Sequence, residues 1–238
     1  MEKIVYNFLT SLSSRMMKTN TIILLLLILL AYTWSNTPLL AQDPTRFSKE
    51  VEKINGAFND SFTGHEIHVF TGSSTIRMWK SLQEDFPGMR IVNTGFGGSQ
   101  TSDLIYYYDQ LIRPYAPGHI FIYEGDNDLA AGKGKGKIMK DMKTLVERIR
   151  ADFPAVSIYL ISAKPSLARW DLKKKNVKLN KKLANYCRDA KNITFIDVWP
   201  VMLDDQGNPK ADIFIEDGLH MNEKGYALWR EVFKAFVK

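Results

Sequence analysis

Short apolar runs of strand length alternate with segments of helical periodicity along most of this 238-residue chain. The apolar runs lie at 67–71, 90–93, 119–124, 157–162 and 193–198. The segments with helical periodicity lie at 102–113, 137–152, 172–188 and 222–237, and a helical lead-in is expected within 43–64. Strands that alternate with helices in this way predict a parallel sheet with helices on both faces, so we expect one α/β domain.

Residues 1–42 differ in composition from the rest of the chain. Basic residues precede an apolar run at 21–31, and the small residue Ala41 follows near a polar junction. This order is typical of a secretory signal peptide, which we expect to be cleaved next to Ala41 or Gln42. The run is shorter than the about 20 residues that cross a bilayer, but flanking apolar residues leave an uncleaved anchor as an alternative. We therefore predict a periplasmic or secreted domain at 43–238, or else a membrane-anchored one.

The charge of the chain does not indicate a nucleic-acid partner. The net charge is +6, of which residues 1–42 contribute +2, and the basic residues are dispersed. One dense run at 132–137 alternates glycine and lysine, but it lacks the Ser or Thr that a phosphate-binding P-loop needs. We interpret this run as a cationic loop near the mouth of the site, which either is simply solvated or attracts an anionic substrate.

Neither a disulfide nor a metal is predicted. Cys187 is the only cysteine, so no intramolecular disulfide can form, and its helical context predicts a buried side chain. His65 and His68 lack the i, i+4 spacing of zinc-protease histidines. We expect no metal ion and no cofactor.

Glycine and polar side chains follow the first three predicted strands. The run 72–74 (Gly-Ser-Ser) ends the first, a glycine-rich turn with Gly98 ends the second, and Asn127 follows the third. Ligands of parallel α/β sheets bind outside the carboxyl ends of the strands, so these groups are expected to lie together. Near the C-terminus, Asp217 precedes His220 by three residues, which lets the carboxylate orient an imidazole that activates a serine. Each motif alone has a commoner role as a turn or a helix cap, but the four in this order predict one site.

These four blocks resemble those of the SGNH, or GDSL-type, serine esterases and acylhydrolases. The resemblance covers about residues 66–238. It implies a three-layer α/β/α sandwich, flavodoxin-like, with a mainly parallel five-stranded sheet. The residues that it implies are the catalytic Ser74 (nucleophile), Asp217 and His220, and the oxyanion-hole donors Ser74, Gly98 and Asn127.

One residue departs from the family pattern. The usual first block is Gly-Asp-Ser, and Ser73 here replaces its aspartate. That aspartate is not the acid of the triad, so no catalytic group is lost. Ser73 nevertheless becomes an alternative nucleophile, although the register of the motif favours Ser74.

The loop after the fourth predicted strand contains Arg169 and Trp170, which we interpret as candidate substrate-pocket residues. Trp170 could pack against an acyl chain or a sugar ring, and Arg169 could meet an anionic group. The alternative is that Trp170 only anchors the loop to the fold.

The function that follows is an exported serine esterase that cleaves a carboxylic ester through an acyl-enzyme. The expected partner is a small-molecule, glycan or lipid ester, with no nucleic acid and with membrane contact only through an uncleaved leader. Deacetylation of a glycan and hydrolysis of lysophospholipids or short-chain lipids are both expected candidates, because a fold does not select its substrate. A catalytically silent carbohydrate- or lipid-binding module on the same scaffold is the alternative from another class.

Overall fold

The computed structural model describes residues 43–57, 64 and 66–237. The signal peptide predicted for residues 1–42 and part of the predicted lead-in lie outside these residues. The helices and strands belong to one unit, Pro44–Lys238. No helix within the described ranges is long and apolar enough to span a bilayer.

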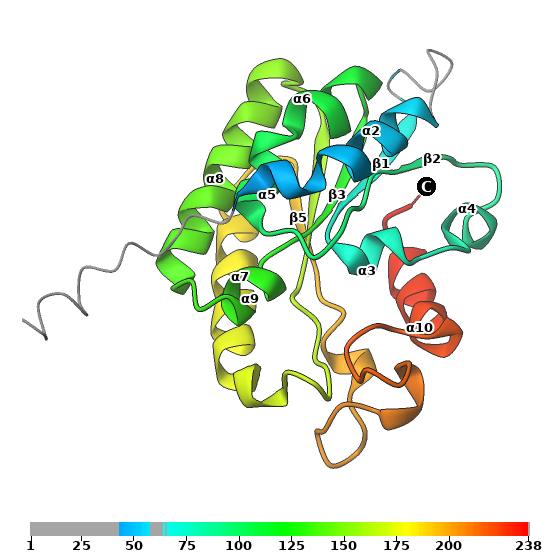
Figure 1. The fold of residues 1–238 in the computed structure, drawn as a ribbon, viewed down its shortest axis with the longest axis vertical. Helices are drawn as coiled ribbons and strands as arrows, with labels where there is room; N and C mark the ends of the chain where they lie inside the picture. Colours follow the sequence, from blue (N-terminus) through cyan, green and yellow to red (C-terminus); the bar gives the residue numbers. More distant parts are fainter. Residues whose placement is uncertain (1–42, 58–63, 65, 238) are drawn as a thin grey trace, which may run out of the picture. The chain divides into compact units, whose positions relative to one another are not determined.

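Five parallel strands form one sheet in the order β2-β1-β3-β4-β5 (Figure 1). They are β1 (Ile67–Gly72), β2 (Arg90–Asn93), β3 (His119–Tyr123), β4 (Ser157–Ile161) and β5 (Ile193–Ile196). Every residue of β1 is buried, as expected for a strand of a parallel sheet covered on both faces. The predicted five-stranded parallel sheet is therefore confirmed.

Two cores lie on the two faces of the sheet, as the side chains of β3 show. Ile120 and Ile122 belong to one core, and Phe121 and Tyr123 belong to the other, because successive side chains of a strand point to opposite faces. The first core packs under α2 (Ser48–Gly56), α5 (Thr101–Tyr106), α8 (Lys135–Asp152) and α9 (Lys173–Arg188), and the second under α3 (Ser74–Arg77) and α10 (Glu223–Phe233). Figure 1 shows these helices on opposite sides of the sheet, which confirms the three-layer sandwich.

Short helices fill the connections between these elements. They are η1 (Pro44–Phe47), α4 (Leu82–Asp85), α6 (Tyr108–Leu111), η2 (Arg113–Tyr115), α7 (Asp126–Ala130), η3 (Trp170–Leu172), η4 (Pro200–Met202) and η5 (Ala211–Ile213). Of these, α7 directly follows β3 and places its first turn at the carboxyl edge of the sheet.

The single helix predicted over 102–113 is wrong, because the structure breaks it at Tyr107. This residue has φ −93° and ψ 13°, outside the α-helical region, and α6 begins after it. The break allows two consecutive tyrosine rings to be buried. Tyr107 donates its hydroxyl to the carbonyl of Pro44 (2.9 Å), and Tyr108 donates to Asp152 Oδ2 (2.8 Å). In an unbroken helix, neighbouring side chains point about 100° apart, so two consecutive rings would not both face the core as fully.

Candidate active site

Ser74 lies at the sharp turn between β1 and α3. β1 ends at Gly72, whose φ is +117°, and a Cβ atom there would lie 2.1 Å from the carbonyl oxygen of Tyr123. Only glycine fits, because any other residue would be strained at this φ and would clash with the β3 backbone. The N–H of Ser73 donates to the same oxygen (3.1 Å), so the turn is tied to β3. Ser74 is then the first residue of α3, and its N–H has no acceptor within the helix.

Ser74 and His220 are 146 residues apart in the sequence and form a hydrogen bond in the fold. Ser74 Oγ lies 2.9 Å from His220 Nε2, and His220 Nδ1 lies 2.5 Å from Asp217 Oδ2. Because a carboxylate only accepts, Nδ1 donates to Asp217, and Nε2 is left to take the proton of the Ser74 hydroxyl. The structure thus brings the three predicted catalytic residues together, and it is Ser74 rather than Ser73 whose hydroxyl contacts the imidazole.

The loop that carries Asp217 and His220 is held by hydrogen bonds of its own. Asp217 Oδ1 accepts the N–H groups of Leu219 (2.8 Å) and His220 (2.9 Å), and the N–H of Ile215 donates to His220 O (2.9 Å). Burial acts to raise the pKa of Asp217, but the hydrogen bonds from the His220 ring and from the two backbone N–H groups outweigh it and lower the pKa to about 2. The carboxylate therefore stays ionised at neutral pH and holds the imidazole in one orientation.

Gly98 and Asn127 lie together on the segments that follow β2 and β3. A Cβ atom on Gly98 would lie 4.0 Å from Asn127 Nδ2, and Gly98 is exposed, so a ligand can reach its backbone. The turn before Gly98 is tied to the serine turn, since the N–H of Phe96 donates to Gly72 O (2.9 Å). Asn127 Nδ2 donates one of its two hydrogens to Ser99 O (2.8 Å), which leaves the other for a ligand. Fixed N–H donors of this kind are what a developing oxyanion requires.

The sequence matches the model of the GDSL-like lipase/acylhydrolase family over residues 60–228, well over half of the chain. The chain belongs to this family. It is a serine ester hydrolase, and its α/β fold is that of its structural neighbours. Among curated proteins, no sequence matches this one.

Solved structures of similar proteins have the same fold as this GDSL-type hydrolase. A protein from Streptococcus pneumonia that is described as a platelet activating factor is 22% identical to this chain. The match covers 90% of this chain and 99% of that chain, with a TM-score of 0.71. A GDSL-like lipase from Bacteroides thetaiotaomicron is 18% identical, with coverages of 82% and 97% and a TM-score of 0.65. A catalytic mutant of an acetylxylan esterase from Geobacillus stearothermophilus is 15% identical, with coverages of 74% and 95% and a TM-score of 0.61. At these identities the likeness concerns the fold.

Arg169 of the GDSL-type hydrolase is bound within the protein, on the side of the oxyanion donors. Its Nη1 lies 2.9 Å from Asp126 Oδ2 and donates to Asn127 Oδ1 at 3.0 Å. With Oδ1 held by Arg169 and one Nδ2 hydrogen held by Ser99 O, the amide of Asn127 has one orientation, and its second Nδ2 hydrogen has one direction. From the sequence, Arg169 is expected to meet an anionic substrate group. The pairing with Asn127 has no sequence signal, because 42 residues separate the two side chains.

Replacing Arg169 by methionine is expected to lower kcat about tenfold, which corresponds to about 1.4 kcal/mol of transition-state stabilisation. The reason is that Asn127 would lose the bond that fixes its amide, while the buried Asp126 would lose its cation. The measurement is kcat and KM on p-nitrophenyl acetate, a neutral ester. Arg169→Lys keeps the charge and should recover part of kcat. An effect confined to KM for anionic esters would instead assign Arg169 to substrate binding.

A second residue of the same loop, Lys164, is fully buried and supports the histidine loop. Its Nζ donates to the carbonyl of Leu219 at 2.5 Å, between the two triad residues of that loop. Burial lowers the pKa of Lys164 to about 8, although the carboxylates of Asp126 and Asp217 act in the opposite direction. The N–H of Ala168 also donates to the carbonyl of the 217–220 loop, at Gly218 (3.0 Å). The segment between β4 and η3 therefore holds both the oxyanion side and the histidine side of the site.

Trp170 lies against a second tryptophan. Its ring stacks on that of Trp199, with centroids 6.0 Å apart and planes at 20°, and Lys173 Nζ lies 4.3 Å from the Trp170 ring centre. Both rings are half-buried. The stacking partner shows that Trp170 helps to anchor its loop, and the exposed part of the pair leaves an aromatic surface near the carboxyl edge of the sheet.

Two buried acidic residues on either side of Asn127 bind the segment that follows Gly98. Ser99 Oγ donates to Glu124 Oε1 (2.7 Å), and burial, followed by the charge of Asp128, raises the pKa of Glu124 well above its usual range. Asp128 accepts from the N–H of Thr101 (3.0 Å) and pairs with Lys133 (3.0 Å). Within the described ranges, no group of three His, Cys, Asp or Glu side chains is placed to hold a metal ion. Glu124 and Asp128 were not predicted as site residues, because their role depends on their burial in the fold.

Proposed function

We propose that this chain is an exported esterase that hydrolyses carboxylic esters through an acyl-enzyme formed on Ser74. The observation that carries the proposal is the continuous set of short contacts from Ser74 Oγ through the His220 ring to Asp217, at 2.9 and 2.5 Å. Export rests on the signal peptide predicted for residues 1–42.

The geometry supports the following sequence of steps. Ser74 Oγ attacks the ester carbonyl carbon while His220 Nε2 takes the hydroxyl proton, and Asp217 stabilises the resulting imidazolium. The carbonyl oxygen gains a negative charge, which the N–H groups of Ser74, Gly98 and Asn127 stabilise. The tetrahedral intermediate collapses, and His220 gives the proton to the leaving alcohol. Water then attacks the acyl carbon of acyl-Ser74 while His220 takes a proton from it. The bond between Ser74 Oγ and the acyl carbon breaks, His220 returns the proton to Ser74 Oγ, and the carboxylic acid leaves.

A small acyl group on a glycan is the substrate that we propose. Two observations support it. The first is the half-buried aromatic surface of Trp170 and Trp199, which suits packing against a sugar ring. The second is the fold shared with an acetylxylan esterase.

A lipid ester is the second candidate, because two apolar side chains are exposed beside the histidine loop. Leu167 is 44% exposed and Ile215 is 42% exposed. Leu167 packs against the loop, since a Cβ atom on Gly218 would lie 3.1 Å from Leu167 Cβ. Exposed leucine and isoleucine at this position could contact an acyl chain or a lipid.

Hydrolysis of p-nitrophenyl esters from acetyl to decanoyl distinguishes the two substrates. We expect the rate to be highest with acetyl and to fall as the chain lengthens. Release of acetate from an acetylated xylan, compared with release of fatty acid from a lysophospholipid, then identifies the alcohol. A preference for decanoyl, together with lysophospholipid cleavage, would favour the lipid candidate.

Labelling with a fluorophosphonate separates the esterase from a silent binding module. We expect covalent labelling of the wild type at Ser74, because the probe needs only an activated serine. A folded protein that cleaves no ester and resists the probe would be a binding module.

A further inference from the structure

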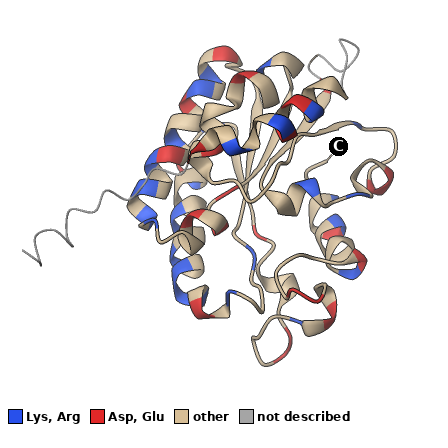
Figure 2. Cartoon of the chain, in the orientation of Figure 1, with Lys and Arg blue, Asp and Glu red and all other residues tan. Residues whose placement is uncertain are grey.

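Helix α9 carries an unusual excess of positive charge. Its 16 residues include six lysines and one arginine but no acidic residue, and the cations are Lys173, Lys174, Lys175, Lys178, Lys181, Lys182 and Arg188. None of the six lysines forms an ion pair with the part of the chain that the structure describes. Figure 2 marks the positions of basic residues along the ribbons of α8 and α9. Like charges at i, i+4 spacing on a helix, such as Lys174 and Lys178, destabilise it slightly, so the repeat of lysines does not stabilise α9.

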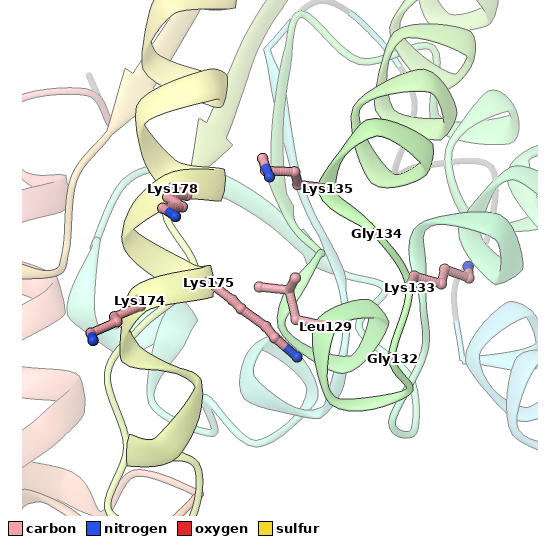
Figure 3. Close-up of a pocket in the computed structure, with 8 residues that line it drawn as sticks. All are labelled: Leu129, Gly132, Lys133, Gly134, Lys135, Lys174, Lys175 and Lys178. Atoms are coloured by element: carbon pink, nitrogen blue, oxygen red, sulfur yellow. The ribbon is translucent and has the colours of Figure 1, made fainter.

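The charge concentrates around a hollow between α9 and the segment that joins α7 to α8. This lysine hollow has a volume of about 290 Å³ and is lined by Leu129, Gly132, Lys133, Gly134, Lys135, Lys174, Lys175 and Lys178. Five of these eight residues are lysines, and none is acidic. The side chains of Lys135 and Lys175 extend into the space between the two segments, whereas Lys133 points away from α9 (Figure 3). Lys133 is bound to Asp128 and to Ser102, at 3.0 Å each.

The start of α8 adds to the positive potential. Gly134 and Lys135 line the hollow, and they are the N-cap residue and the first residue of this 18-residue helix. No acidic residue occupies the first turn, and no side chain caps the helix. The N-terminus of a helix carries a partial positive charge that favours anions. The hollow therefore combines this partial charge with unpaired lysines.

The lining identifies the chemistry of the ligand. The cations continue along α9 from Lys174 to Lys182, a span of about 12 Å at the rise of an α-helix, so the surface fits a chain of anionic groups better than one ion. Leu179 and Leu183 of α9 are buried in the core, and a single exposed valine, Val177, does not make an apolar face, so α9 is not suited to insert into a bilayer. No aromatic side chain lines the hollow, so it offers no surface on which bases could stack.

We propose that the lysine hollow binds an acidic polysaccharide, a sugar chain that carries carboxylate groups. Leu129 of the lining belongs to α7, the short helix that also carries Asn127. A chain bound at the hollow therefore lies next to the helix that carries this oxyanion donor. The further step, that the bound chain bears the ester to be cleaved, rests on the function proposed above.

Binding is measured on the full chain with Ser74→Ala, which leaves the polymer unaltered. The probes are polygalacturonate as the acidic chain and xylan as the neutral chain, titrated by calorimetry. The hollow variant carries Lys135→Glu, Lys175→Glu and Lys178→Glu. The control variant carries Lys49→Glu, Lys53→Glu and Lys80→Glu, three exposed lysines on α2 and after α3. Both variants change the net charge by the same amount, so they separate the hollow from the general positive charge.

We expect the hollow variant to weaken polygalacturonate binding at least about tenfold and the control variant less than about threefold. The reason is that salt screens the attraction between distant charges, so only lysines next to the bound chain contribute strongly. Xylan should bind both variants alike. With Ser74 intact, all lysine variants should keep their melting temperature and their rate on p-nitrophenyl acetate, because none of these lysines touches the site.

Equal losses in the hollow and control variants would overturn the proposal. It would also be overturned if polygalacturonate failed to bind. In that case, hollow-dependent binding of phosphatidylglycerol-containing vesicles or of DNA would show a membrane or nucleic-acid surface instead. These results do not depend on hydrolysis. An inactive protein that still binds polygalacturonate through the hollow would contradict the proposed function alone.

Discussion

Replacing Ser74 by alanine is expected to lower kcat/KM on p-nitrophenyl acetate by about 10⁴-fold or more. The hydroxyl that contacts the His220 ring would be lost, and no acyl-enzyme could form on Ser74. The melting temperature should change little, because the change removes one oxygen atom and keeps the backbone of the turn. A small residual rate is expected, since the N–H donors stay in place. Steady-state kinetics and thermal unfolding of the same preparation test both statements.

Ser73→Ala is the matched control for this prediction. Ser73 is the neighbouring residue, has the same side chain and lies on the same turn, but its hydroxyl forms no bond with the imidazole in the described structure. We expect its activity to stay within about fivefold of the wild type, which corresponds to a change of about 1 kcal/mol or less in the activation free energy. If Ser73→Ala were inactive and Ser74→Ala active, the two serines would have to exchange roles.

The fold could be predicted from the sequence because its signals are local. A strand buried on both faces is a short apolar run, and helices such as α8 show their buried face as a repeat of apolar residues. The broken helix at Tyr107 was missed because the periodicity does not show that two adjacent rings must both be buried. Its cause is tertiary, since the partners of the two hydroxyls lie in distant segments.

The candidate site divides in the same way. Ser74, Asn127, Asp217 and His220 belong to short motifs, which can be found without knowing any contact. The groups that hold them do not. Lys164 acts on a carbonyl 55 residues away, and only its burial distinguishes it from the many surface lysines of the chain. Backbone acceptors have no sequence signature, so such support becomes visible only in the folded chain.

Asn127→Asp is expected to lower kcat by about 100-fold to 1000-fold, the usual effect of losing one oxyanion donor. Aspartate has the shape of asparagine and could still accept from Arg169, but it has no N–H to offer and would bring a negative charge toward the developing oxyanion. KM should change much less than kcat, because the charge on the carbonyl oxygen develops only in the transition state. The measurement is a full kinetic analysis on p-nitrophenyl acetate.

Asn127→Ala tests the same donor without adding a charge. It removes the N–H and also releases Ser99 O and Arg169 from their bonds with the amide, so kcat should fall by a similar factor. Asn127 takes no part in the contact between Ser74 and His220 that activates the serine hydroxyl. Both Asn127 variants should therefore still react with a fluorophosphonate, although more slowly. An Asn127→Ala enzyme with an unchanged kcat would mean that the backbone N–H groups of Ser74 and Gly98 stabilise the oxyanion alone. The amide of Asn127 would then serve only to connect Ser99 with Arg169.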